Sequence, residues 1–421
     1  MHVRLPPTEY ERYATAWDAI ALDGLRELNL DAWAAGQRYL SLTAVCLSPS
    51  EAAELAHIAG AFAPLLDLAV QGILDDPDWW SALAWPHAAL ELARQEAPHP
   101  AGRVSLFGRL DCLLDAEGHW QVIEYNADTP SGAREACGLE PGVRRLYPGT
   151  RCLSTSLARQ LVATLCARLP DQVRCVGVVS SHSWLEDMSE ATWLADRLRR
   201  AGTPTLVGDV TDLAVGRGGR IMLRGEPLEA LYRFYPIERL YRHAIFTSLE
   251  EAALDGQLVL LNGLRGFLAQ SKACLAWLWS NRMSLSVAER ALIERHLPPT
   301  VLLRSTEADS LRADGVVKHV NGREGDSVVF SRGLDDAAWE ARLLEGGYVI
   351  QRAVASPALA DVDVDDWQGR VARLEPRYAC VGAFVVGGQF AGCYTRLDGP
   401  ITSHRATYVA TLVEHAPAPR R

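Results

Sequence analysis

Two adjoining stretches of alternating apolar and polar residues, at 103–126, constrain the fold more than any other part of this 421-residue chain. They read RVSLFGRLDCLLDAEGHWQVIEYN and predict two antiparallel strands joined by a turn at 115–118. A turn with an even number of residues sets the register of such a hairpin and pairs Arg109 with Glu124.

The same register gathers polar side chains on one face of the hairpin. Because side chains alternate across a sheet, Arg109, Asp111, Glu124 and Asn126 project together. Two carboxylates and an amide oxygen suit Mg²⁺ shared with phosphates, whereas a solvated polar face is the plainer alternative. The polar turn at 127–132 follows directly, where a substrate would meet the carboxylates, and it favours the first interpretation. An odd turn or a bulge would break the shared face.

Lysine is scarce, and both lysines lie among apolar neighbours. Of the 42 basic residues only Lys272, in QSKACL, and Lys318, in VVKHV, are lysines. Isolated lysines in apolar settings are better candidates for phosphate contacts than for solvated charges. Gly322 and Gly325 follow Lys318 in a loop whose N–H groups suit closure over a triphosphate, although an ordinary hairpin turn fits as well.

Composition limits the class of protein. The net charge of −10 argues against a general binder of nucleic acid, which needs a basic face. Nine scattered cysteines without a C-x-x-C pair, and histidines never within five residues of one another, argue against a disulfide framework or a zinc site. The sequence has no export signal, no run of 18 apolar residues, and no P-loop, G-x-G-x-x-G or G-x-S-x-G motif. We therefore expect a cytoplasmic α/β protein of two to three domains.

Periodicity predicts the elements around the hairpin. Residues 8–98 are expected to be helical, with Ser50 capping one helix, and 173–240 to form a β-α-β unit. Ser183 and Glu186 fit a capping box for the helix of that unit. Beyond residue 260 the pattern predicts a helix at 270–281 and strands at 314–320, 326–331, 347–353 and 379–396, the last turning at Gly387-Gly388.

Five motifs, taken together and in order, resemble the C-terminal synthetase domain of glutathionylspermidine synthase. The most specific is E-Y-N-A-D-T-P at 124–130, and the matches span residues 105–410. The motifs are RLD at 109–111, EYNADTP at 124–130, QSKA at 270–273, VK with GREG at 317–325, and VGAFVVGG running on to DGPIT at 381–402.

The resemblance implies an ATP-grasp fold in circularly permuted order, with ATP between two antiparallel sheets. Carried over by motif, Asp111, Glu124 and Asn126 would bind Mg²⁺, and Arg109 would contact the transferring phosphate. Lys272 and Lys318 would hold the α- and β-phosphates of ATP. The remaining positions that it implies for ATP are the lid, Gly322, Arg323, Glu324 and Gly325, and the adenine reader, Gln351.

The resemblance also implies domains and substrate contacts. It divides the chain into a helical region (1–102), the hairpin with its substrate loop (103–160), a pre-ATP-grasp β-α-β domain (161–245), the nucleotide part (246–412) and a disordered tail (413–421). The family's amidase domain is not expected, because only about a hundred residues precede Arg109. Positions that it places near substrate are Asp128, Thr129, Ser131, Glu135, Arg396 and Arg405; whether Glu186, Asp187 and Thr192 act or only cap a helix stays open.

The expected activity is ATP-dependent ligation of a carboxylate to an amine through an acyl phosphate, with small-molecule partners and neither nucleic acid nor membrane. Departures from the family at Gln270 and His319 leave the acid, the amine and the oligomeric state undetermined. A kinase of the same fold, acting on a hydroxyl, and a non-catalytic nucleotide-binding protein are the alternatives.

Overall fold

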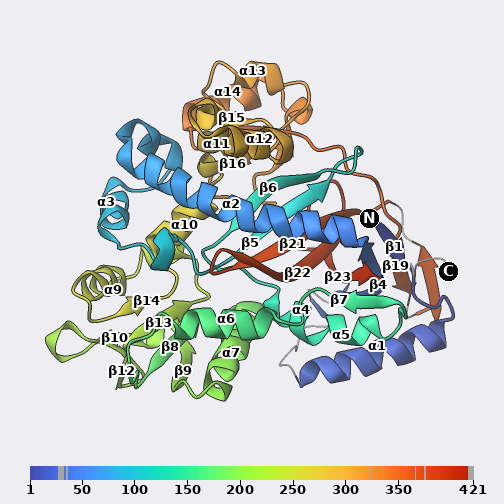
Figure 1. Ribbon diagram of the computed structural model, residues 1–421, viewed down its shortest axis with the longest axis horizontal. Helices are drawn as coiled ribbons and strands as arrows, with labels where there is room; N and C mark the ends of the chain where they lie inside the picture. The colour runs from blue at the N-terminus through green and yellow to red at the C-terminus, as the bar shows by residue number, and fades with distance from the viewer. Residues whose placement is uncertain (27–32, 35–36, 324, 366, 374–375, 416–421) are drawn as a thin grey trace.

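The centre of the molecule is an eight-stranded mixed sheet (Figure 1). The computed structural model describes residues 1–26, 33–34, 37–323, 325–365, 367–373 and 376–415. Strand order is β1-β4-β23-β22-β21-β5-β6, with β7 paired to β23; β4 runs parallel to β23 and the other neighbours are antiparallel. The strands are β1 (His2–Arg4), β4 (Leu40–Leu47), β5 (Phe107–Leu114), β6 (Trp120–Asn126), β7 (Thr150–Cys152), β21 (Tyr378–Val386), β22 (Gln389–Asp398) and β23 (Thr407–Glu414).

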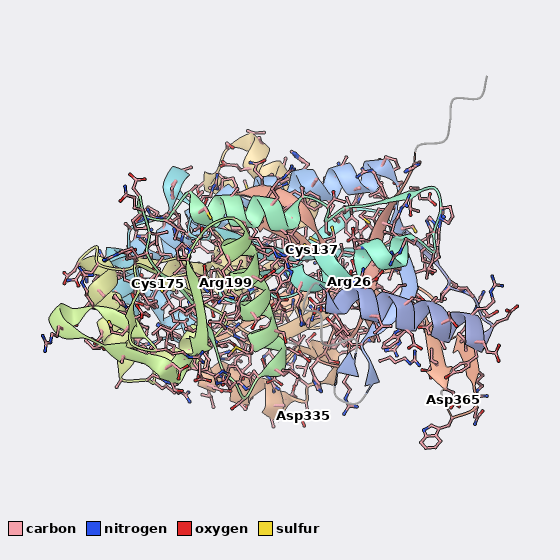
Figure 2. The ribbon with its side chains drawn as sticks, turned by 90° about the horizontal axis from the view of Figure 1, so that it is seen from below. Arg26, Cys137, Cys175, Arg199, Asp335 and Asp365 are labelled. Carbon is pink, nitrogen blue, oxygen red and sulfur yellow. The ribbon has the colours of Figure 1, made fainter. Side chains whose placement is uncertain are left out.

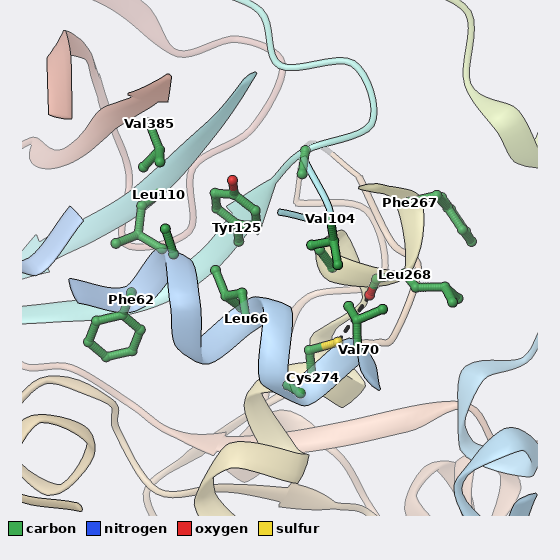
Figure 3. Packing of buried hydrophobic residues seen from close by; sticks show 14 of the residues in the cluster. Phe62, Leu66, Val70, Val104, Leu110, Tyr125, Phe267, Leu268, Cys274 and Val385 are labelled. Atoms are coloured by element: carbon green, nitrogen blue, oxygen red, sulfur yellow. Dashed lines mark hydrogen bonds between the residues drawn. The ribbon is translucent and has the colours of Figure 1, made fainter. Parts of the chain in front are cut away.

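One face of this sheet is covered by the long helix α2 (Pro49–Asp75), which crosses it in Figure 1. Its apolar residues recur at three- and four-residue spacing, and Phe62 and Leu66 pack with Leu110 of β5 in one core cluster (Figure 3). This helix is long and apolar enough to cross a membrane, but it is packed as the core helix of the fold. Its N-cap is Ser48, in a capping box with Glu51, so the predicted cap at Ser50 is wrong by two residues.

The prediction that 8–98 is wholly helical is also wrong. Helices α1 (Tyr10–Leu25), α2 and α3 (His87–Gln95) are present, but β4 lies between the first two. Every residue of β4, LSLTAVCL, is buried, including Ser41 and Thr43, whose hydroxyls donate to Asp361, and the alternation of polar and apolar residues ends at Thr43. The strand brings the N-terminal region into the sheet that holds the hairpin.

The opposite face of the sheet is divided between helices and polar side chains. Helices α4 (Ala133–Gly138), α5 (Glu140–Arg144) and α6 (Leu157–Cys166) cover its part near β22 and β23 (Figure 1). Cys137 of α4 and Arg199 of α7 (Leu185–Arg200) lie on this side of the molecule (Figure 2). The rest of the face carries the polar residues of the hairpin.

The turn of the β5–β6 hairpin is odd, contrary to the prediction. It spans five residues, 115–119, because Leu114 pairs with Trp120. The predicted pairing of Arg109 with Glu124 is therefore wrong, and the odd turn alone would move the Glu124 side chain to the other face.

A β-bulge restores the shared face. The register shifts again beside Asp111, leaving Ile123 as the extra residue, so that Asp111 pairs with Glu124 and Arg109 with Asn126. The odd turn and the bulge each shift the register by one residue, so together they leave the side-chain alternation as predicted. All four predicted side chains therefore belong to one face.

The β-α-β unit is confirmed and forms a parallel sheet beside the hairpin, with order β14-β13-β8-β9. Helix α7 begins after Trp184 without a side-chain cap, so the predicted capping box of Ser183 and Glu186 is wrong. Ser183 N instead donates to Ser181 Oγ (3.3 Å). The elements are β8 (Val176–Ser180), α7 (Leu185–Arg200), β9 (Thr205–Asp209), β13 (Ala230–Arg233), β14 (Val259–Leu260), α8 (Ile237–Leu240), α9 (Ile245–Leu254) and a small sheet of β10 (Leu213–Val215), β11 (Ile221–Leu223) and β12 (Glu226–Pro227).

A second antiparallel sheet, β15-β18-β16-β17, faces the hairpin and confirms the predicted strands between 314 and 353. The predicted helix at 270–281 starts at Lys272, because Ser271 is extended and caps α11 through its hydroxyl. The elements are β15 (Thr300–Leu302), β16 (Gly315–His319), β17 (Val329–Phe330), β18 (Tyr348–Arg352), α10 (Leu264–Gln270), α11 (Lys272–Asn281), α12 (Val287–His296), α13 (Ala308–Leu311) and α14 (Asp336–Glu345). Two short hairpins complete the fold, β2 (Trp33–Ala34) with β3 (Gln37–Arg38), and β19 (Val362–Asp365) with β20 (Arg370–Arg373).

The hairpin of β21 and β22 turns at Gly387 and Gly388, as predicted; both have positive φ, which a two-residue turn requires. The predicted start of the disordered tail at residue 413 is wrong, because Val413 and Glu414 are the last residues of β23; residues 416–421 lie outside the described residues.

Candidate active site

A cavity of about 430 Å³ lies between the polar face of the hairpin and the second sheet. Its charge is opposite to that of the protein as a whole: six cationic and three anionic side chains line it, in a chain of net charge −10. Such a local excess of positive charge attracts polyanions whatever the total charge. The cationic residues are Arg109, Lys318, Arg323, Arg332, Arg352 and Arg396, and the anionic ones are Asp111, Glu124 and Asp187.

Asp111 is the centre of a buried network at one end of the cavity. Arg109 donates to both of its carboxylate oxygens, from Nε (2.6 Å) and Nη2 (3.0 Å). Arg396 Nη2 (3.1 Å) and Asn126 Nδ2 (3.2 Å) also donate to Asp111 Oδ2. Burial alone would raise the pKa of Asp111, but the two arginines hold it below its ordinary value. The carboxylate is therefore ionised, and both guanidinium groups are fixed in place.

The two lysines meet different partners. Lys272, the first residue of α11, donates from Nζ to Gly322 O (2.8 Å) and lies 3.4 Å from Glu124 Oε1. Lys272 itself is not on the cavity wall, but its partner Glu124 is.

Lys318 lies in β16, and the other end of the cavity is built around it. Its Nζ donates to two neutral acceptors, Gln351 Oε1 (2.7 Å) and Ile123 O (3.1 Å). Burial lowers the pKa of Lys318 to about 8, although Glu124 favours the charged form. Gln351 in turn donates from Nε2 to Thr300 Oγ1 (2.8 Å), so its amide is engaged at both ends.

The predicted lid loop is closed by ion pairs in the described part of the chain. Arg323 donates to Asp128 Oδ2 (2.6 Å), to both oxygens of Glu238 (2.6 and 3.0 Å) and to Thr129 Oγ1 (2.9 Å). A Cβ on Gly325 would lie 2.4 Å from a backbone oxygen of the 399–402 loop, so the two loops touch. Glu324, predicted as part of the lid, lies outside the described residues.

Several predicted substrate residues do not line the cavity. Asp128 is fully buried, and Arg233 and Arg323 hold its charge; Glu135 is buried beside Arg134. Arg405 is exposed in the loop after β22. The predicted direct contacts of these residues with substrate therefore have no support in the geometry, whereas Thr129, Ser131 and Arg396 do lie on the cavity wall.

The structure shows the positions of Asp187 and Thr192, whose roles the sequence left open, and of Cys380, which the sequence analysis did not predict. Asp187 lies on the wall, whereas Thr192 bonds its own helix at Met188 O (2.8 Å). Cys380 lies on the wall opposite Arg396 in β21 and β22; the alternation of VGAFVVGG extended one strand position back would have indicated it.

The donor set suits magnesium and a nucleotide triphosphate. Asp111, Glu124 and Asn126 supply hard oxygen atoms from one face, and two of them are carboxylates, as is usual for Mg²⁺ that is shared with substrate phosphates. Lys318 lies on the cavity wall beside Ile123, and Lys272 lies 3.4 Å from Glu124 Oε1, so both place positive charge next to these oxygen atoms, where phosphates need counter-charge.

An antiparallel sheet that faces the antiparallel hairpins of a larger mixed sheet across a cationic cavity, with a parallel β-α-β domain alongside, defines an ATP-grasp enzyme, and enzymes of this class that act as ligases use ATP and Mg²⁺. Residues 24–414 match the family described as glutathionylspermidine synthase preATP-grasp. The chain belongs to this family, and it is an ATP-dependent ligase.

Solved structures of other ligases are distantly similar. One from Methylobacillus flagellatus KT, described as a candidate gamma-glutamylcysteine synthetase, aligns with 83% of this chain and 88% of its own at 12% identity and a TM-score of 0.46. The ATP-grasp ligase PsnB, complexed with minimal precursor, aligns with 58% of this chain and 91% of its own at 14% identity and a TM-score of 0.28. We base the fold class on the family match and the sheet topology.

Proposed function

We propose that this enzyme joins a carboxylate to an amine, using ATP and releasing ADP and phosphate. The observation that carries the proposal is the cavity itself, where six cations and two hairpin carboxylates line one space in an acidic protein. A carboxylate substrate and ATP are both anionic, so their approach requires this excess of positive charge.

In the proposed reaction, a carboxylate oxygen of the acid attacks the γ-phosphorus of ATP, and the bond from that phosphorus to the β,γ-bridging oxygen breaks. ADP leaves with those bonding electrons, and an acyl phosphate forms. The amine then attacks the acyl carbon, loses a proton and expels phosphate, which leaves an amide. Lys272 and Lys318 would offset the charge of the nucleotide phosphates, and Arg109 and Arg396 the charge of the transferred group.

Asp111, Glu124 and Asn126 would hold Mg²⁺, which supplies Lewis-acid polarisation of the phosphates when bound. The chain's own residues do the rest: Arg109 orients the phosphate through a guanidinium already fixed on Asp111, and the Arg323 loop excludes water.

The cavity also lacks an activated side-chain nucleophile among its described residues. Cys380 is the thiol on its wall, and burial raises the pKa of Cys380 to about 11, so the thiol stays protonated at neutral pH. A mechanism in which the two substrates react directly through a phosphorylated acid fits this wall better than a covalent enzyme intermediate.

The test is a phosphate-release screen with ATP and Mg²⁺ over pooled amino acids, short peptides and polyamines, followed by mass analysis of the product. We expect ADP and phosphate only when an acid and an amine are both present, with an amide as product. A phosphorylated hydroxyl with no free phosphate would identify a kinase instead, and ATP binding without turnover in any pool would contradict the proposal.

A further inference from the structure

One peptide group links the arginine of the cavity to a buried acid of the β-α-β domain. The carbonyl oxygen of Ser131 accepts from Arg109 Nη1 (2.8 Å). The N–H of Gly132, at the other end of the same peptide bond, donates to Glu190 Oε1 (2.7 Å). Since the peptide is planar, the two hydrogen bonds set its rotation together.

The surroundings leave this peptide little freedom. Gly132 has φ +97°, where a side chain is strained, and an added Cβ would lie 2.4 Å from the ring of Tyr394. The same ring lies under the Arg109 guanidinium, whose carbon is 5.1 Å from the ring centroid. Tyr394 therefore contacts both partners, and rotation of the peptide would displace the arginine.

Burial of the Glu190 carboxyl group costs free energy that packing alone does not require. Glu190 lies in α7, it is 2% exposed, and its Oε2 has no hydrogen-bond partner among the described residues. Burial, and then the neighbouring Glu135, raise the pKa of Glu190 to about 8. An apolar side chain would fill the same space without this desolvation cost. The hydrogen bond from Gly132 N–H is therefore the contact that accounts for a carboxyl group at this position.

We propose that Glu190 is a positioning residue for Arg109 and that it acts through the Ser131–Gly132 peptide. It is one residue of the β-α-β domain that sets the geometry at the phosphate-binding end of the cavity. Its acceptor oxygen matters, and its charge does not. The inference rests on the proposed function only in that Arg109 is taken to contact the transferring phosphate.

Three substitutions separate the acceptor oxygen from the ionisable group. Glu190→Gln keeps the acceptor and removes the ionisable group, Glu190→Asp keeps the ionisable group and withdraws the acceptor, and Glu190→Met removes both at similar volume. We expect kcat for ADP formation to stay within about threefold for Gln and to fall about 10- to 100-fold for Asp and Met, because a displacement of about 1 Å costs this much. KM for ATP should change little, because the lysines are untouched.

Glu250 provides the matched control. It is also a buried acid of the β-α-β domain, 4% exposed, and burial raises its pKa to about 8, but among the described hydrogen bonds it makes none to the Ser131–Gly132 peptide. Glu250→Met should alter thermal stability without altering kcat. Normal kcat in Glu190→Met, or a fall in Glu190→Gln as large as in Asp, would overturn the proposal; should Met fail to fold, the Gln and Asp pair decides it.

A second readout needs no turnover. In ¹⁵N-labelled protein, the Arg109 Nε–H and Gly132 amide resonances should shift in the Asp and Met variants and stay near the wild-type positions in Glu190→Gln and Glu250→Met. An unmoved Arg109 resonance in both Asp and Met variants overturns the positioning role. A wild-type enzyme that makes no amide in the screen contradicts the proposed function but leaves this result intact.

Discussion

The two ends of the cavity hold positive charge in opposite ways. At one end Arg109 and Arg396 share the buried carboxylate of Asp111. At the other end Lys318, equally buried, donates only to the neutral oxygens of Gln351 and Ile123 among its described hydrogen-bond partners. The arginines are therefore hydrogen-bonded to a carboxylate before any substrate arrives, whereas Lys318 has no hydrogen-bonded carboxylate among the described residues and is favoured only by the more distant charge of Glu124.

The difference follows from the chemistry of the two cations. A guanidinium stays charged when buried, and its planar fork fixes both itself and the carboxylate. An ammonium loses its proton more readily, so a buried lysine without a counter-charge costs stability until an anion binds. We infer that the arginine end is preorganised, whereas the lysine end gains its compensation from the nucleotide.

The largest expected effect is at the arginine end. Asp111→Asn leaves Arg109 and Arg396 buried without their counter-charge, so the free energy of unfolding should fall by about 3–5 kcal/mol. Loss of the fixed geometry and of a metal ligand should also lower the rate of ADP formation on the order of 10²–10³-fold. Urea unfolding and a coupled ADP assay measure the two effects.

Asp336→Asn is the control for that substitution. Asp336 also pairs with an arginine, Arg312, but its side chain is 89% exposed. Its loss should change stability by less than about 1 kcal/mol and leave activity unchanged. A stability loss in Asp111→Asn no larger than this would show that the arginine end is not a compensated network.

The next effect has the opposite sign for stability. Lys318→Met removes a buried cation that has no hydrogen-bonded counter-charge among the described residues and whose desolvation outweighs the favourable field of Glu124, so the ligand-free protein should gain on the order of 1–3 kcal/mol at pH 7. ATP affinity should fall about 30-fold, because a phosphate loses a buried partner. Calorimetry with ATP and chemical denaturation give both numbers.

Lys272→Met tests whether the gain depends on the missing counter-charge. Lys272 is as buried as Lys318, but it lies 3.4 Å from the carboxylate of Glu124. Its removal leaves that carboxylate unpaired, so stability should not rise. Equal stability gains for the two substitutions would contradict the distinction drawn here between the lysines.

The sequence predicted the chemistry of this cavity better than its packing. The strands with their polar alternation, the two lysines and the E-Y-N-A-D-T-P motif were sufficient for the fold class and for residues that now line one space. The β4 strand was missed because its alternation covers only LSLT, and the buried run AVCL that follows shows none. The shared face of the hairpin was predicted from a wrong turn length, and a bulge that no local pattern indicates compensated for it.

Contacts between distant segments could not be predicted at all. Arg323 was expected to serve a mobile lid, yet it bonds Glu238 and Asp128, which lie 85 and 195 residues away in sequence. Glu190 reaches Gly132 across 58 residues. Such contacts depend on how the β-α-β domain packs on the hairpin, and a single sequence with no observable covariation carries no signal for them.

A smaller effect should appear in the pH dependence of the wild-type protein. Because the folded-state pKa of Lys318 is about 8, below its ordinary 10.5, the ammonium loses its proton above pH 8 and ATP affinity should decline by up to tenfold per pH unit. The stability of the ligand-free protein should change in the other direction: the cost of the buried charge is complete below pH 8 and is relieved between pH 8 and 10.5. Calorimetric titrations at several pH values, with Lys318→Met as reference, isolate this lysine; a flat difference across that range would contradict it.

The smallest effect is expected when Lys318 is given a hydrogen-bonded carboxylate, as Arg109 and Arg396 already have in Asp111. Gln351→Glu keeps the acceptor for Lys318 at 2.7 Å and makes it anionic, while the Thr300 hydroxyl, which donates to Pro298 O (2.7 Å), must turn from that carbonyl to bond the other oxygen. The added charge should raise the pKa of Lys318, moving the midpoint of the ATP-affinity decline up by about one pH unit. Affinity at pH 7 should fall only a few-fold, since the carboxylate then competes with phosphate for the ammonium. An unchanged midpoint would mean that burial of Lys318, and not the lack of a charged partner, sets the difference between the two ends.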